Sequence, residues 1–304
     1  MNARLLFLAC CLAANVAHAK QYALIVSGLG GETEYEQRFQ TEAKQLTAAT
    51  IRASAQAQVA TLVGAKATRT AIHAVLAEWA TQITADDQLM VTLIGHGSFD
   101  GDDYRYNIPG PDITATELHD WLQPLQARQQ LIVLATSASG GAIARLQNDH
   151  RIVIAATKSG NERNATRFAE YWVQALSSAE ADHDKNDWIT AQEAFDFATR
   201  KVADGFKSNA SLATEHARLE GKHAESWPLG RLGNAKDMPN DAQLVELFAA
   251  RLRSENEFDA LKGRKAEMQP DAYYSELEKT LVAIAKTQRR IDARQAALSK
   301  EPPR

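Results

Sequence analysis

Short apolar runs alternate with amphipathic stretches over the first 180 residues. The runs predict buried strands, and the Ala-rich stretches between them predict helices. We expect strands over 22–26, 58–63, 88–94, 130–136 and 151–157. We expect helices over 34–53, 68–81, 114–122 and 142–148, and a further helix that follows 158–162 and runs to about 178. Strands that alternate with helices imply right-handed crossovers and a mainly parallel sheet. The predicted fold class is therefore α/β.

After residue 240 the pattern changes to charged, glycine-free helical periodicity over 241–254 and 271–299. A 4-3 spacing relates Leu277, Leu281, Ile284, Gln288, Ile291, Gln295 and Leu298. This spacing is typical of a coiled-coil seam, here interrupted by two glutamines. It predicts a helical extension over 235–304. The extension either packs as a hairpin on its own domain or forms an arm that binds a partner.

The first nineteen residues have the pattern of a signal peptide. Arg4 precedes an apolar run over 5–16, and Ala17-His18-Ala19 is typical of a cleavage site before Lys20. The run is too short for a transmembrane helix, and no later segment of the mature chain suggests one. We therefore expect an exported protein, periplasmic or secreted.

The composition restricts the chemistry further. Apolar residues make up 45% of the chain and charged residues 24%, as in ordinary globular proteins. The net charge of −4 gives no reason to expect a nucleic-acid partner. Both cysteines, Cys10 and Cys11, lie in the expected leader. The mature chain would thus have no thiol for a disulfide, a nucleophile or a metal ligand.

Reactive side chains in parallel sheets gather where the strands end. His96 follows the third predicted strand and lies between Gly95 and Gly97, whose small size lets a substrate backbone approach. The Gly97 N–H is an oxyanion-hole candidate. Ser137 follows the fourth strand, where its hydroxyl could act as a nucleophile. Alternatively, Ser137 and Ser139 are simple helix N-caps.

These two segments together resemble the caspase–legumain clan of cysteine peptidases. Residues 89–98, LMVTLIGHGS, resemble its histidine strand, and residues 131–140, LIVLATSASG, resemble its nucleophile strand. The resemblance covers about 21–206. It implies a caspase-like three-layer domain over 20–234 with a mainly parallel central sheet. It also implies His96 as the catalytic histidine.

The departures from that pattern change the expected activity. Ser137 stands where the clan has its nucleophilic cysteine, and the turn 28–31 lacks the asparagine with which legumains orient the histidine. A serine hydroxyl needs a well-oriented base, whereas a thiol ionises readily beside an imidazole. We expect an inactive or strongly altered peptidase homologue that binds a protein or peptide. The alternative is a serine peptidase or hydrolase with a Ser137–His96 dyad.

Two further arrangements stay open for a serine enzyme. The acidic loop Asp100, Asp102 and Asp103 either supplies an orienting group for the histidine or is merely solvated. In an α/β-hydrolase frame, Ser139 is the alternative nucleophile, with His216 or His223 as the base. No organic cofactor is required, because the glycine-rich turn 28–31 matches a dinucleotide fingerprint poorly.

Residues 182–193 have the spacing of an EF-hand calcium loop. The expected ligands, at positions 1, 3, 5, 7, 9 and 12, are Asp182, Asp184, Asn186, the Trp188 carbonyl, Thr190 and Glu193. Position 6, usually glycine, is Asp187. The same segment also contains Thr190-x-x-Glu193, the sequence of a helix capping box. The loop therefore either binds calcium or is a solvated turn before a capped helix.

Overall fold

The computed structural model describes residues 20–54, 57–232 and 268–298, with scattered positions between 243 and 265. The expected signal peptide over 1–19 and the expected domain boundary at 234 lie outside these residues, as does much of the predicted helix 241–254. Within the described part of the chain, no helix is both long and apolar enough to span a bilayer.

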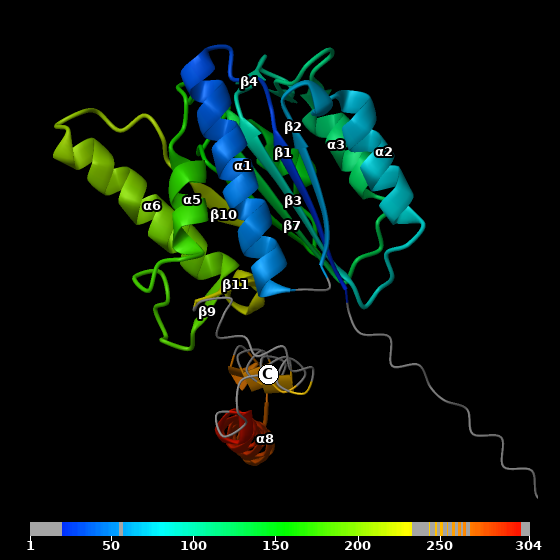
Figure 1. Ribbon diagram of the computed structural model, residues 1–304, viewed down its shortest axis with the longest axis vertical. Coiled ribbons are helices and arrows are strands. Elements are labelled where there is room, and N and C mark those ends of the chain that lie inside the picture. Colours follow the sequence, from blue (N-terminus) through cyan, green and yellow to red (C-terminus); the bar gives the residue numbers. More distant parts are fainter. Residues whose placement is uncertain are drawn as a thin grey trace, which may run out of the picture.

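A six-stranded sheet forms the centre of the α/β domain (Figure 1). Its strands are β1 (Gln21–Ser27), β2 (Gln58–Val63), β3 (Gln88–Gly95), β7 (Gln129–Thr136), β8 (Arg151–Ala155) and β10 (Arg218–Glu220). The order is β10-β8-β7-β3-β1-β2, and only β10 runs antiparallel to its neighbour. The five predicted strands are confirmed. The sixth was missed because its three residues are mostly charged.

Helices cover both faces of this sheet, which gives the predicted three layers (Figure 1). One face carries α1 (Thr33–Ala53), α5 (Phe168–Ala175) and α6 (Ala191–Ser208), and the other α2 (Arg69–Ala80), α3 (Ala115–Leu122) and α4 (Ile143–Leu146). The period-2 alternation of strand side chains separates two cores. In β1, Ala23 and Ile25 face α1, whereas Leu24 and Val26 face α2. Short 3-10 turns occupy Gly64–Lys66 (η1), Ser139–Ala142 (η2) and Ala224–Ser226 (η3).

Three of the predicted boundaries are wrong. The predicted helix over 142–148 contains only α4, and the last predicted strand ends at Ala155 rather than 157. The helix predicted to follow Glu162 begins only at Phe168. Its start is set by the distant Glu215, whose carboxylate accepts the N–H groups of Arg167 and Phe168, both at 2.8 Å. No local pattern could reveal that long-range cap.

Two small sheets lie outside the central one. The first contains β4 (Gly97–Phe99), β5 (Tyr104–Tyr106) and β6 (Ile113–Thr114). Its Tyr106 hydroxyl donates to the carbonyls of Val26 and Ile94, and so ties this sheet to the carboxyl ends of β1 and β3. The second pairs β9 (Trp188–Thr190) with β11 (Pro228–Arg231). Neither was predicted, because strands of two to four residues carry too little periodicity.

The C-terminal helix α8 (Pro270–Leu298) confirms the helical extension, but the predicted seam is only partly right. Ile291 is 1% exposed, and Gln288 accepts a hydrogen bond from Arg251. Leu281, however, is 46% exposed. Tyr273, which the seam did not include, is buried instead. The side chains of Gln295 and Leu298 lie outside the described part.

Candidate active site

The sheet brings His96 and Ser137 to adjacent strand ends. In the parallel pair β3–β7, Gly95 lies opposite Thr136, so the next residue on each strand is a predicted site residue. Gly97, the residue after His96, packs tightly against Ser137 and Tyr104. A Cβ on Gly97 would lie 2.7 Å from the Ser137 carbonyl oxygen and 2.5 Å from a ring carbon of Tyr104. Only glycine fits this close approach. The oxyanion role of Gly97 stays a prediction.

The imidazole of His96 is held in a fixed orientation. Its ring contacts Tyr35 and Phe39 edge-on, with ring centroids 5.1 Å away in each case. Its Nε2 lies 3.2 Å from the carbonyl oxygen of Gly30. Because a carbonyl only accepts, Nε2 carries the hydrogen, which leaves Nδ1 as the lone-pair nitrogen of the neutral ring.

The turn 28–31 orients the histidine even though it lacks the asparagine of legumains. The orienting group is a backbone carbonyl, which no side-chain motif records. Burial lowers the pKa of His96, and this effect outweighs the opposing hydrogen bond to Gly30. The ring is accordingly neutral at pH 7, as a general base must be.

Ser137 is buried but unbonded. The residue is 2% exposed, and its Oγ has no hydrogen-bond partner in the described part of the chain. The next residue, Ala138, is fully buried and has a left-handed φ of 56°, which is strained for a residue with a Cβ. Its N–H donates to the carbonyl of Glu162, which holds the turn in place. Ser137 does not cap a helix, so that alternative is wrong for this residue.

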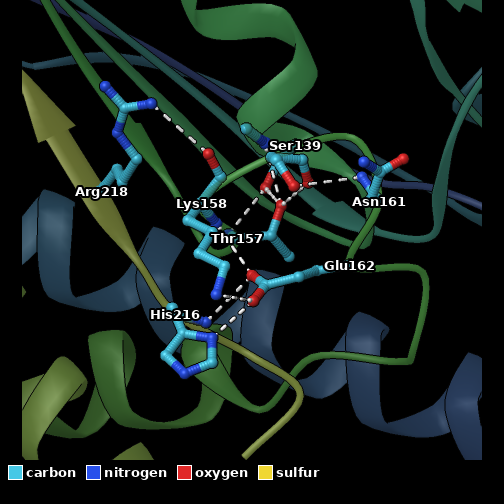
Figure 2. A network of polar contacts seen from close by, with 9 residues as sticks. Ser139, Thr157, Lys158, Asn161, Glu162, His216 and Arg218 are labelled. Atoms are coloured by element: carbon cyan, nitrogen blue, oxygen red, sulfur yellow. Dashed lines mark hydrogen bonds and ion pairs between the residues drawn. The ribbon is translucent and has the colours of Figure 1, made fainter. Parts of the chain in front are cut away.

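Ser139 lies two residues further on in a fully bonded network, shown in Figure 2. Its Oγ accepts the N–H of Thr157 at 3.2 Å and lies 3.3 Å from the Thr157 hydroxyl. That hydroxyl in turn accepts the Gly140 N–H and donates to the Ser159 carbonyl. The side chain of Ser139 therefore joins the loops after β7 and β8. It is neither a helix cap nor an accessible nucleophile.

The α/β-hydrolase interpretation finds no base for Ser139. Figure 2 shows His216 on the far side of Glu162, with which its Nδ1 pairs. Burial alone would raise the pKa of Glu162, but the hydrogen bonds from Lys158 and His216 lower it overall. His223 is exposed and pairs weakly with Glu225 at 4.0 Å. Among the described residues, no hydrogen bond links Ser139 to either histidine.

The acidic loop between β4 and β5 is a solvated turn. Asp100 accepts hydrogen bonds from the N–H groups of Asp102 and Asp103. It also forms an exposed ion pair with Arg105. These bonds close the turn on itself. Asp100 thus does not orient His96.

The loop 182–193 has the geometry of a helix cap and also gathers carboxylates. The capping box between Thr190 and Glu193 is present at the start of α6, which confirms the predicted cap. Carboxylate oxygens of Asp182, Asp184 and Glu193 lie within 4.8 Å of one another, and Asp187 adopts the left-handed φ of 67° that position 6 requires. Burial, and then repulsion from Glu193, raises the pKa of Asp184. This all-oxygen set fits a hard cation. Calcium binding stays a prediction.

Comparison with protein families supports the resemblance seen in the two strand-end motifs. The model of the peptidase C13 family matches residues 34–227. The chain belongs to the peptidase C13 family. Membership makes it a legumain-like and caspase-like peptidase homologue and agrees with the α/β architecture described above.

Among solved structures, the chain is similar to a crystal structure of a protein from Geobacter sulfurreducens. The two share 13% sequence identity with a TM-score of 0.49, and the match covers 70% of this chain and 100% of the other. Similarity at this level adds nothing to the family assignment. No curated protein matches the chain.

Proposed function

We propose that this C13 homologue is exported and binds a protein or peptide ligand at the edge formed by the ends of β3 and β7, with little or no cleavage. The signal-peptide pattern over 1–19 supports export. Removal of this leader would also remove Cys10 and Cys11, and with them all cysteine chemistry. In this proposal Ser137 occupies the place of the family's nucleophilic cysteine.

The observation that carries the proposal is the isolation of the Ser137 hydroxyl. Its Oγ is buried and bonds to nothing described, while the bonded nitrogen of His96 is directed at Gly30. A serine hydroxyl becomes nucleophilic only when a base accepts its proton within hydrogen-bond distance. A thiol would depend less on that contact, because its ordinary pKa is only ~8.5.

The same edge also has features that favour the second candidate, an active serine hydrolase. A buried hydroxyl without a hydrogen-bond partner lowers the stability of the fold by roughly 1–3 kcal/mol. Such a group is therefore often retained for function rather than for folding. His96 is oriented and neutral, and the strained Ala138 follows Ser137 directly. Substrate binding could bring the hydroxyl to Nδ1, because catalytic hydrogen bonds often tighten only in the complex.

Labelling with a fluorophosphonate separates the two candidates. The binding proposal predicts no labelling of the wild-type chain and binding of library peptides, seen by fluorescence anisotropy, without new fragments in mass spectra. Labelling that disappears in Ser137→Ala but persists in Ser139→Ala would establish the hydrolase. Ser137→Cys provides a third measurement. Iodoacetamide should alkylate Ser137→Cys faster than it alkylates the Ser137→Cys/His96→Ala double variant if His96 acts as a base on residue 137. Such a difference in rate would show that the base still reaches this position.

A further inference from the structure

The helix α8 has an apolar face that nothing in the described chain covers. Tyr274, Leu281 and Val282 are 57%, 46% and 42% exposed. With Leu277, Glu278 and Ala285 they line a shallow hollow of about 410 Å³. The face turned towards Tyr273 and Ile291 is the buried one. An exposed apolar stripe beside an already buried seam indicates an interaction surface.

The charges of α8 are divided between its two halves. Before Thr280 the helix carries Asp271, Glu276 and Glu278 against Lys279. After Thr280 it carries Lys286, Arg289, Arg290 and Arg294 against Asp292. Figure 1 shows α8, in red, outside the three layers of the sheet domain. A parallel pair of such helices would place like charges together, whereas an antiparallel pair places acidic halves against basic ones.

The apolar stripe of one α8 is also complementary in side-chain size to the stripe of a second α8 that runs antiparallel to it. About a centre beside Thr280, Tyr274 meets Ala285 of the other copy, a large side chain opposite a small one. In the same register Leu277 meets Val282, and Leu281 meets Glu278. Asp271 and Arg289 are 18 residues apart, which is five turns at 3.6 residues per turn, so both lie on one flank of the stripe. In an antiparallel pair, equivalent flanks face each other.

We propose that α8 is a dimerisation helix that pairs antiparallel with α8 of a second copy of this chain. The stripe Tyr274, Leu277, Leu281, Val282 and Ala285 forms the apolar contact. Asp271 of each copy pairs with Arg289 of the other. Neither side chain makes an ion pair within the described part of the chain. A two-fold axis makes the contact closed and isologous.

Sedimentation equilibrium of the full chain over 1–100 μM tests this proposal. The wild type is expected to be a dimer, and Leu281→Glu is expected to raise the dimer dissociation constant at least tenfold. Leu212→Glu is the matched control, because Leu212 is 86% exposed but lies outside α8. The leader is common to all variants and cannot explain a difference among them. A wild-type monomer at 100 μM, or a dimer that Leu281→Glu leaves unchanged, overturns the proposal.

A charge exchange tests the antiparallel register. Asp271→Arg and Arg289→Asp each place two like-charge pairs in the contact, so each should weaken the dimer several-fold. The double variant restores opposite charges and should restore the wild-type dissociation constant. Glu278→Leu removes the charged member of the hollow and should tighten the dimer. Circular dichroism checks that each variant is folded. Failure of the double variant to recover, with both single variants weakened, would reject the register.

Discussion

The end of β7 has two serines two residues apart, and their surroundings differ completely. Ser139 lies towards β8, where every polar atom of the Ser139–Thr157 contact is bonded. Ser137 lies towards β3, where its hydroxyl is buried without a partner beside the oriented His96. Folding alone explains the first arrangement, since each bond joins two loops. It does not explain the second, which costs stability, and this difference identifies Ser137 rather than Ser139 as the functional candidate.

The side of the β7 end that carries the bonded Ser139 should lose more stability when a side chain is enlarged there. A Cβ on Gly140 would lie 2.3 Å from the backbone atoms Lys158 C and Ser159 N, which cannot move without breaking the loop contact. Gly140→Ala should therefore lower the free energy of unfolding by more than ~4 kcal/mol, measured by urea denaturation. Gly205→Ala in α6 is the control. The nearest side-chain atom is 3.6 Å away, so alanine there should be neutral or gain about 0.5–1 kcal/mol.

A second buried side chain with an unbonded oxygen is Glu42, whose other oxygen, Oε1, lies 3.7 Å from Arg38 Nε, and it should make stability depend on pH. Glu42 is 5% exposed, its Oε2 has no partner in the described chain, and burial raises its pKa from 4.5 to about 7. Between these values the folded state binds more protons than the unfolded state, so the free energy of unfolding falls as pH rises from about 4.5 to about 7.

The loss that Glu42 contributes is at most roughly 3 kcal/mol, and it levels off about one pH unit above its folded pKa. Glu42→Gln should remove this share of the slope in urea titrations across pH 4.5–8, while Glu215, whose pKa burial also raises to about 7, keeps its own share. Glu34→Gln, an exposed position on the same helix, should retain it. A wild-type protein whose stability rises through this range would show that Glu42 is ionised in the fold.

The two serines themselves give the direct comparison. Ser139→Ala leaves the buried Thr157 N–H without its acceptor and should cost about 1–3 kcal/mol. Ser137→Ala removes an atom with no partner, so the free energy of unfolding should stay within about 0.5 kcal/mol of wild type or rise. Thr157→Ser retains the hydroxyl and should lower the free energy of unfolding by less than Thr157→Val does. Equal losses at positions 137 and 139 would contradict the assigned difference between the two sides.

A smaller effect is predicted for the third polar cluster, in the loop 182–193. If Asp182, Asp184 and Glu193 bind calcium with a dissociation constant of ~1 mM, 10 mM calcium should add roughly 1.4 kcal/mol of stability. A melting temperature raised by a few degrees would show it. Asp184→Asn removes one of the three carboxylate charges and should weaken the response. Asp204→Asn, an exposed carboxylate of α6 outside the loop, should keep it. An unchanged melting temperature in 10 mM calcium would leave the loop as a helix cap only.

The sequence predicts the central sheet well because its strands are long, apolar and separated by helical periodicity. The sequence also shows that His96 and Ser137 directly follow successive apolar strands, whereas the pairing of these two strands is decided by the fold. The sequence fails where a distant partner decides the structure. The start of α5 depends on Glu215, and the orientation of His96 depends on a carbonyl in a turn without informative side chains. The exposed position of Leu281 depends on which face of α8 is covered.

Side-chain identity thus determined the α/β class, the family resemblance and the prediction that Ser137 stands at the nucleophile position. Only the tertiary structure decided which of two nearby serines is bonded and what holds the histidine. It also decided that the capping box of Thr190 and Glu193 forms while the nearby carboxylates still gather. The physical reason is that strand formation follows local apolar periodicity, whereas hydrogen-bond satisfaction depends on which backbone groups the fold brings within about 3 Å.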